Sequence, residues 1–183
     1  MSTTSLSDVL VIEPKSFEDH RGFFLESYNE RDFVAATGLN VRFVQDNHSQ
    51  SSCGVLRGLH YQIEQPQGKL IRVVTGEVFD VCVNMQRNHP QFGQWTGVYL
   101  NAKDKKMLWI PPGFAHGFLV LSASSDVLYK TTDYYSPESE RCLVWDDPQV
   151  CINWPLNQIP NSIPMLTAKD LAGRSLSDAD LFN

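Results

Sequence analysis

Apolar residues along this chain occur in short runs, and turn-forming residues separate each run from the next. The runs are rich in Val, Leu, Phe, Tyr and Trp, which is typical of β-strands. Many short strands at regular spacing indicate a sandwich or barrel rather than a doubly wound parallel sheet, so we predict an all-β jelly roll. The predicted strands cover residues 9–14, 22–28, 41–47, 54–62, 69–74, 78–85, 96–100, 106–111, 117–122, 126–132 and 142–147.

Helical patterns are few and short. Residues 30–38 (ERDFVAATG) predict an early helix that Gly38 ends, and residues 166–176 and 177–182 predict short helical turns near the C-terminus. Thr75-Gly76-Glu77 separates two predicted strands so closely that we expect a hairpin turn there. Gly76 would supply the positive φ that such a turn requires.

Length and composition place the chain among ordinary globular proteins. Its 183 residues, 42% of them hydrophobic, predict a single domain over residues 1–183. A net charge of -6 argues against a nucleic acid or an anionic membrane surface as a partner. The apolar runs end well before the length of a membrane span, and the first residues lack the pattern of a signal peptide. The four cysteines have no CxxC spacing, which predicts reduced, mostly buried thiols and a cytoplasmic protein.

One predicted strand, residues 54–62 (GVLRGLHYQ), combines a fixed cation with a titratable base. Arg57 and His60 are three residues apart, so in a regular strand their side chains would point to opposite faces. Gly58 lies between them and would permit a β-bulge that brings both onto one face. We predict that bulge. The alternative is that the long Arg57 side chain bends around from the other face.

A second segment indicates which jelly roll this is. Residues 109–117 (WIPPGFAHG) break a strand at a Pro-Pro-Gly turn and resume it after His116, which resembles the second motif of the cupin jelly roll. Many cupins hold a metal with several histidines and a glutamate, but the comparable first-motif strand here offers only His60. His20, His48 and His89 lie in polar, turn-like segments, where solvated or hydrogen-bonded histidines are usual. We therefore expect no metal and no cofactor.

Several further motifs together resemble one family. The sequence is similar to the dTDP-4-dehydrorhamnose 3,5-epimerases, the nucleotide-sugar epimerases of deoxysugar pathways. The resemblance implies the substrate dTDP-4-dehydro-6-deoxy-glucose, with proton removal and return at C3 and C5, the carbons beside the C4 ketone. It extends over nearly the whole chain, through residues 21–28, 43–49, 54–62, 67–73, 76–81, 92–95, 108–118, 128–140 and 167–170.

The resemblance implies a role for each of the residues that the chemistry needs. His60 is the expected base, since an imidazole titrates near neutrality, and Asp170 would hold its ring. Lys69 would stabilise the developing enolate oxygen, and Tyr129 would deliver a proton from the opposite face of the sugar. Without the resemblance, His60 would be taken as a core histidine, Lys69 as a solvated lysine and Tyr129 as a packing residue.

The resemblance also implies a set of substrate contacts and a homodimer. Arg57 and Arg21 would bind the diphosphate, and Tyr135 would stack on the thymine ring. Arg21 and Glu26 lie on an early segment that in this family reaches into the partner subunit. The remaining expected contacts are polar residues that otherwise would only satisfy nearby backbone, namely Gln45, Asp46, Asn47, His116, Glu140 and Lys169, with Lys69 also in contact with the substrate.

Other functions remain possible from the sequence. A relative that inverts only C3 or only C5 would share His60, Asp170 and most of the nucleotide contacts. A ketoisomerase on the same scaffold fits the motifs less well. A metal-dependent cupin oxygenase would need a bound metal, and a non-catalytic nucleotide-sugar-binding protein would need Arg57 and Tyr135 but no His–Asp pair.

Overall fold

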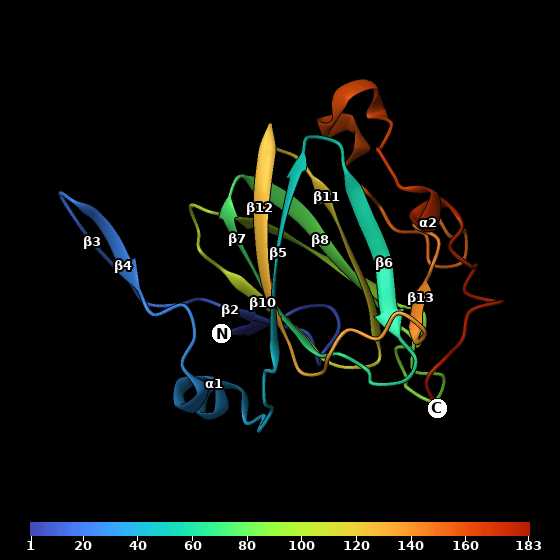
Figure 1. Cartoon of the computed structure of the whole chain (residues 1–183), viewed down its shortest axis with the longest axis horizontal. Helices are drawn as coiled ribbons and strands as arrows, with labels where there is room; N and C mark the ends of the chain where they lie inside the picture. Colours follow the sequence, from blue (N-terminus) through green and yellow to red (C-terminus); the bar gives the residue numbers. More distant parts are fainter.

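Two antiparallel sheets face each other in the computed structural model, which describes all residues 1–183 (Figure 1). The first sheet has the strand order β1 (Ser2–Thr3), β2 (Leu10–Ile12), β10 (Met107–Ile110), β7 (Lys69–Thr75), β12 (Ser124–Thr131) and β5 (Gln45–Ser52). The second has the order β13 (Glu140–Cys142), β6 (Leu56–Gln62), β11 (Phe114–Val120), β8 (Glu77–Asn84) and β9 (Trp95–Asn101).

The chain crosses repeatedly between the two sheets, and this is the jelly-roll arrangement that the strand pattern predicted. From β6 onward, most successive strands lie in opposite sheets. The hairpin prediction at Gly76 was wrong for this reason. Strands β7 and β8 flank that glycine closely but belong to different sheets, so the turn is a corner between layers. Gly76 does have the predicted positive φ, 75°.

The core has one part between the sheets and one part outside the second sheet. Side chains on β8 alternate between them, because successive residues of a strand point to opposite faces. Val78 and Cys82 pack between the sheets, whereas Phe79, Val81 and Val83 pack outward. That outer cluster is covered by the C-terminal part of the chain, which includes two short 3₁₀ helices, Leu156–Gln158 and Pro160–Ser162, and α2 (Ala168–Leu171). The predicted helical turn over residues 177–182 is a turn without a helix.

The early helix forms as predicted. Helix α1 (Glu30–Thr37) begins at Asn29, whose side chain accepts hydrogen bonds from Arg31 N and Asp32 N, and it ends at Gly38 with φ 72°. Its Phe33 packs on Trp109 of the first sheet. Before α1, strands β3 (Ser16–Asp19) and β4 (Gly22–Leu25) pair only with each other and project from the body as an arm (Figure 1).

The strand prediction failed at one place that matters for function. Strand β5 has the sequence QDNHSQSS, without an apolar residue, and the sequence pattern placed a strand only as far as residue 47. It nevertheless pairs along its whole length with β12. One face of β5 lines a polar cavity and the other faces outward, so neither face requires apolar side chains.

No helix of the structure has the length and apolar composition needed to span a membrane. The four cysteines are free thiols, as expected, but the prediction that most are buried was wrong. Only Cys82 is buried, Cys53 and Cys142 are half-buried, and Cys151 is exposed.

Candidate active site

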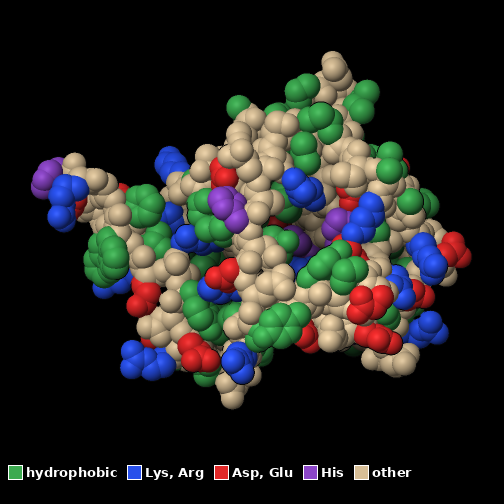
Figure 2. Space-filling model, viewed as in Figure 1, with side chains coloured by type: hydrophobic (Ala, Val, Ile, Leu, Met, Phe, Trp, Pro, Cys, Tyr) green, Lys and Arg blue, Asp and Glu red, His purple; other side chains and the backbone are tan.

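A polar cavity opens between the two sheets, where Figure 2 shows a hollow bordered by histidine and by lysine or arginine side chains. Its volume is about 340 Å³. Both sheets contribute to its walls, together with the segment that enters α2. The lining includes most of the residues that the sequence singled out, namely Gln45, Asn47, Arg57, His60, Lys69, His116, Tyr129, Tyr135, Glu140, Lys169 and Asp170.

The predicted bulge in β6 is present and explains how Arg57 and His60 share this cavity. His60 lies opposite His116 of β11 and Arg57 opposite Phe118, so Gly58 and Leu59 together face the single residue Gly117. Gly58 has φ 111°, and a Cβ at this position would lie 2.6 Å from the His116 carbonyl oxygen. Only glycine fits there.

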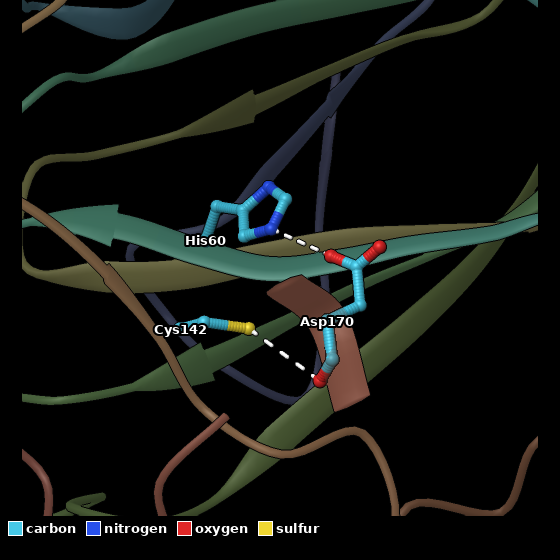
Figure 3. Close-up of side chains that lie close together, drawn as sticks. All are labelled: His60, Cys142 and Asp170. Carbon is cyan, nitrogen blue, oxygen red and sulfur yellow. Dashed lines mark hydrogen bonds and ion pairs between the residues drawn. The ribbon is translucent and has the colours of Figure 1, made fainter. Parts of the chain in front are cut away.

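His60 and Asp170 are adjacent, as the resemblance implied. His60 Nε2 lies 2.7 Å from Asp170 Oδ1, and Asp170 is almost completely buried (Figure 3). The two atoms are close enough to form an ion pair once the ring is protonated, although the angle at Nε2 does not satisfy a hydrogen bond. Nδ1 points away from the carboxylate, so it is the nitrogen left free for proton transfer (Figure 3). Burial lowers the pKa of His60 and outweighs the opposing effect of Asp170, so the ring is a neutral base at neutral pH.

Local structure around α2 fixes the Asp170 carboxylate. Thr167 and Asp170 form a capping box, in which Asp170 N donates to Thr167 Oγ1 and Thr167 N donates to Asp170 Oδ2. Thr167 Oγ1 also donates to Asp170 Oδ2, at 2.6 Å. Gly58 N also donates to Asp170 Oδ1, at 3.3 Å, and so ties the carboxylate to the bulge. Burial alone would raise the pKa of Asp170, but the Thr167 hydrogen bond and the nearby His60 outweigh it and lower that pKa. Asp170 is therefore a carboxylate at neutral pH.

Lys69 supplies a buried cation to the cavity. Its side chain is almost fully enclosed, and Nζ donates to the His60 carbonyl oxygen at 3.4 Å. Burial lowers the pKa of Lys69 to about 8, although the carboxylates of Asp80 and Glu140 act in the opposite direction. Asp80 is completely buried and contacts Nε2 of His116, a cavity residue, at 2.9 Å. His116 is thus held by its own carboxylate, separately from His60.

Tyr129 lies on β12, in the sheet opposite the one that carries His60, and both residues line the cavity. Burial raises the pKa of Tyr129, and Arg57 opposes that shift only partly. The phenol therefore keeps its proton at neutral pH and can donate it. A base on one wall and an acid on the other is the arrangement that inversion at a carbon requires.

The rim of the cavity carries a linked set of polar groups. Tyr135 donates its hydroxyl proton to Glu140 Oε2 at 2.6 Å, and Lys169 forms an ion pair with the same oxygen. The loop with Tyr135 is anchored by the buried Gln62, whose side-chain nitrogen donates to the Tyr134 carbonyl oxygen and whose side-chain oxygen accepts from Ser136 N. Arg57 is held by Ser51 Oγ at 2.9 Å.

Three expected contact residues are not in this cavity. Asp46 lies between Gln45 and Asn47 on β5, so it points to the other face and forms an ion pair with Lys130. Arg21 and Glu26 belong to the arm and the segment that follows it, away from the cavity of their own chain. Arg21 is exposed and pairs only with Asp19.

The cavity also contains residues that the sequence reasoning missed. Ser49 follows Gln45 and Asn47 at every second position of β5, and Thr167 heads the capping box, so both had a readable signal. Gln67 and Phe118 had none. The outlying histidines behave as expected, because His48 pairs with Asp126 and His89 accepts from the Gln91 backbone nitrogen.

Comparison with known proteins agrees with this geometry. The sequence model described as dTDP-4-dehydrorhamnose 3,5-epimerase matches residues 3–178. The protein of that name from Pseudomonas aeruginosa is 56% identical over 178 residues, which are 97% of this chain and 96% of the relative. The crystal structure of dTDP-6-deoxy-D-glucose-3,5-epimerase from Legionella pneumophila, in complex with dTDP-4-keto-L-rhamnose, is 49% identical with a TM-score of 0.93. The match covers 97% of this chain and 93% of that one.

The cupin-like jelly roll and these relatives define the class of protein as an isomerase that acts by epimerisation. The chain belongs to the dTDP-4-dehydrorhamnose 3,5-epimerase family, as its motifs predicted. The fold is also shared with ChmJ of Streptomyces bikiniensis, a 3'-monoepimerase whose crystal structure contains dTDP-quinovose. That chain is 30% identical, with a TM-score of 0.88 over 97% of this chain and 88% of ChmJ.

Proposed function

We propose that this protein inverts C3 and C5 of dTDP-4-dehydro-6-deoxy-glucose to give dTDP-4-dehydro-L-rhamnose, without a cofactor, in the biosynthesis of dTDP-L-rhamnose. The observation that carries the proposal is the placement of His60, held by Asp170, on one wall of the cavity and of Tyr129 on the other. The names of the relatives supply the substrate.

In the proposed mechanism, neutral His60 removes the proton from a carbon beside the C4 ketone. The imidazolium that forms is stabilised by Asp170, and the negative charge that moves to the ketone oxygen is stabilised by the ammonium of Lys69. Tyr129 then donates its proton to the opposite face of the same carbon, and the configuration is inverted. Because both C3 and C5 flank the ketone, the same groups can act at each carbon in turn.

The nucleotide needs separate contacts. Arg57 lines the cavity beside the bulge and would bind a diphosphate oxygen, and Tyr135 is half-exposed at the rim, where a base could stack on its ring. Gln45, Asn47, Glu140, His116 and Lys169 are further substrate contacts on this proposal.

In a homodimer, the arm formed by β3 and β4 would contact a second copy of the chain. Phe23 and Phe24 of β4 are 60% and 71% exposed, which is costly for a monomer, and Arg21 has no partner outside its own turn. We propose that the arm packs on a second copy and that Arg21 and Glu26 serve the partner's cavity. Residues 1–183 form one domain on this proposal, and the free thiols support a cytoplasmic location.

Incubation with the 4-keto sugar nucleotide in deuterated water tests the function. Label at both C3 and C5 is expected. Label at only one carbon would favour the alternative of a single-centre epimerase, to which the similarity with ChmJ gives support. No label at either carbon would refute an epimerase of either kind.

A further inference from the structure

The proposed base belongs to a group of three different metal-ligating side chains. His60, Cys142 and Asp170 each offer one ligand atom, and these three atoms lie within 4.8 Å of one another (Figure 3). The resemblance gives no role to Cys142. Its neighbours in the structure are carbonyl oxygens, with Sγ 3.5 Å from that of Leu143 and 4.0 Å from that of Asp170.

His60 can offer Nε2 to this group once the ring proton moves to Nδ1, which also blocks the nitrogen otherwise left free for proton transfer. Nε2 is buried and has no hydrogen-bond partner, although Asp170 Oδ1 is only 2.7 Å away, because the angle is unsuitable. The imidazole nitrogen of His60, the carboxylate of Asp170 and the sulfur of Cys142 together form a set of donors that suits Zn²⁺.

The distances also suit a small cation. Three atoms within 4.8 Å of one another have a common centre within about 2.8 Å of each, whereas Zn–N and Zn–S bonds are about 2.0–2.3 Å long. Side-chain shifts of less than an ångström would therefore complete the ligand distances, and a water molecule would supply the fourth ligand.

A separate route reaches the sulfur. Cys142 does not line the substrate cavity but lines a neighbouring cavity of about 230 Å³, together with Tyr61, Lys169 and Arg174. Glu140 also lines this second cavity, beside the basic side chains of Arg141, Lys169 and Arg174.

We propose that His60, Cys142 and Asp170 form a zinc-binding site that inhibits the enzyme by occupying the ring nitrogen that faces Asp170. Zinc there would displace the proton of the Cys142 thiol, whose pKa burial raises to about 12, and release it to solvent. It would also break the His60–Asp170 pair and hold the ring as a metal ligand. Binding of the ion depends only on the three side chains. The loss of turnover rests additionally on the proposed function, in which His60 is the base.

Zinc titration of native enzyme, C142A and C142S tests the site, with C151S as a matched control that removes an exposed thiol. Turnover is measured in a buffer without chelators, and Co²⁺ is used in parallel as a spectroscopic substitute for Zn²⁺. Native enzyme and C151S should lose activity at micromolar Zn²⁺ and regain it with EDTA. C142A and C142S should keep turnover within about twofold of native and need at least about tenfold more zinc for the same inhibition.

The cobalt spectrum distinguishes failure of this inference from failure of the proposed function. Native enzyme should show a thiolate-to-cobalt charge-transfer band that is absent in C142A. Equal zinc sensitivity of native enzyme and C142A, or no such band in native enzyme, would overturn the site. A different outcome is that native enzyme shows the band but has no turnover even before metal is added. That result would refute the proposed function but would still support the metal site.

Discussion

The alkaline limit of activity should be set by Lys69. Its ammonium is enclosed by protein, and burial lowers its pKa from 10.5 to about 8, so the cation disappears about 2.5 pH units below the pH at which a solvated lysine would lose it. If the charge on Lys69 stabilises the enolate, kcat/KM should fall about tenfold per pH unit above pH 8.

Three forms of residue 69 separate this effect from others. Lys69→Arg keeps a charge that does not titrate in this range, so its alkaline limit should move toward the titration of Tyr129, whose pKa is raised above its usual value of 10.0. Lys69→Met should lose about 10²–10³-fold in kcat below pH 8, the usual effect of removing one oxyanion donor, and this deficit should shrink above pH 8 as native Lys69 loses its proton. The kcat of Lys69→Gln, which keeps a neutral hydrogen-bond donor, should lie between those of Lys69→Arg and Lys69→Met.

Burial of Lys69 should also make the free energy of unfolding depend on pH. Between pH 8 and 10.5 the unfolded chain binds a proton at Lys69 that the folded chain has lost, so the free energy of unfolding should rise with pH in this window. The shift from 10.5 to about 8 corresponds to about 3 kcal/mol, and comparison with Lys69→Met in denaturant titrations isolates it. An unchanged alkaline limit near pH 8 in Lys69→Arg would refute the role of Lys69, and the absence of this stability difference would refute its buried charge.

Two further substitutions test the opposite wall and the rim. Tyr129→Phe should reduce product formation at least a hundredfold while solvent deuterium still enters the substrate, because His60 can remove and return a proton on its own face. Equal loss of product formation and of deuterium uptake would argue against Tyr129 as the acid. Tyr134→Phe serves as the exposed control. Gln62→Ala should raise KM more than it lowers kcat, because Gln62 anchors the loop that carries Tyr135. Gln158→Ala serves as the remote control. An unchanged KM would exclude that anchoring role.

Sequence periodicity predicted most strands of the fold because their apolar side chains reach the core on one or both faces. It failed for β5, whose faces contact a polar cavity and solvent instead. It also placed Gly76 in a hairpin, because residues next to a tight turn do not reveal whether the strands on either side pair or belong to separate sheets.

The shared position of Arg57 and His60 could be predicted because local geometry determines it. The sequence GVLRGLHYQ carried its own signal, since two polar residues three apart with a glycine between them require a bulge to share one face. The prediction that Asp46 contacts the substrate went against local geometry. Gln45 and Asn47 on either side of it line the cavity, so alternation along β5 points Asp46 to the other face. The contact between His60 and Asp170 joins residues that are far apart in the chain, so no local pattern could supply it, and only the family resemblance did.

In the proposed mechanism, His60 removes the carbon-bound proton. The most direct measurement is deuterium uptake from deuterated water by the 4-keto sugar nucleotide with native enzyme and with His60→Ala, with dTDP affinity determined for both. Native enzyme should show uptake at C3 and C5, and His60→Ala should show at least a hundredfold slower uptake, while dTDP affinity changes by no more than about threefold. Uptake by His60→Ala at the native rate would contradict this mechanism.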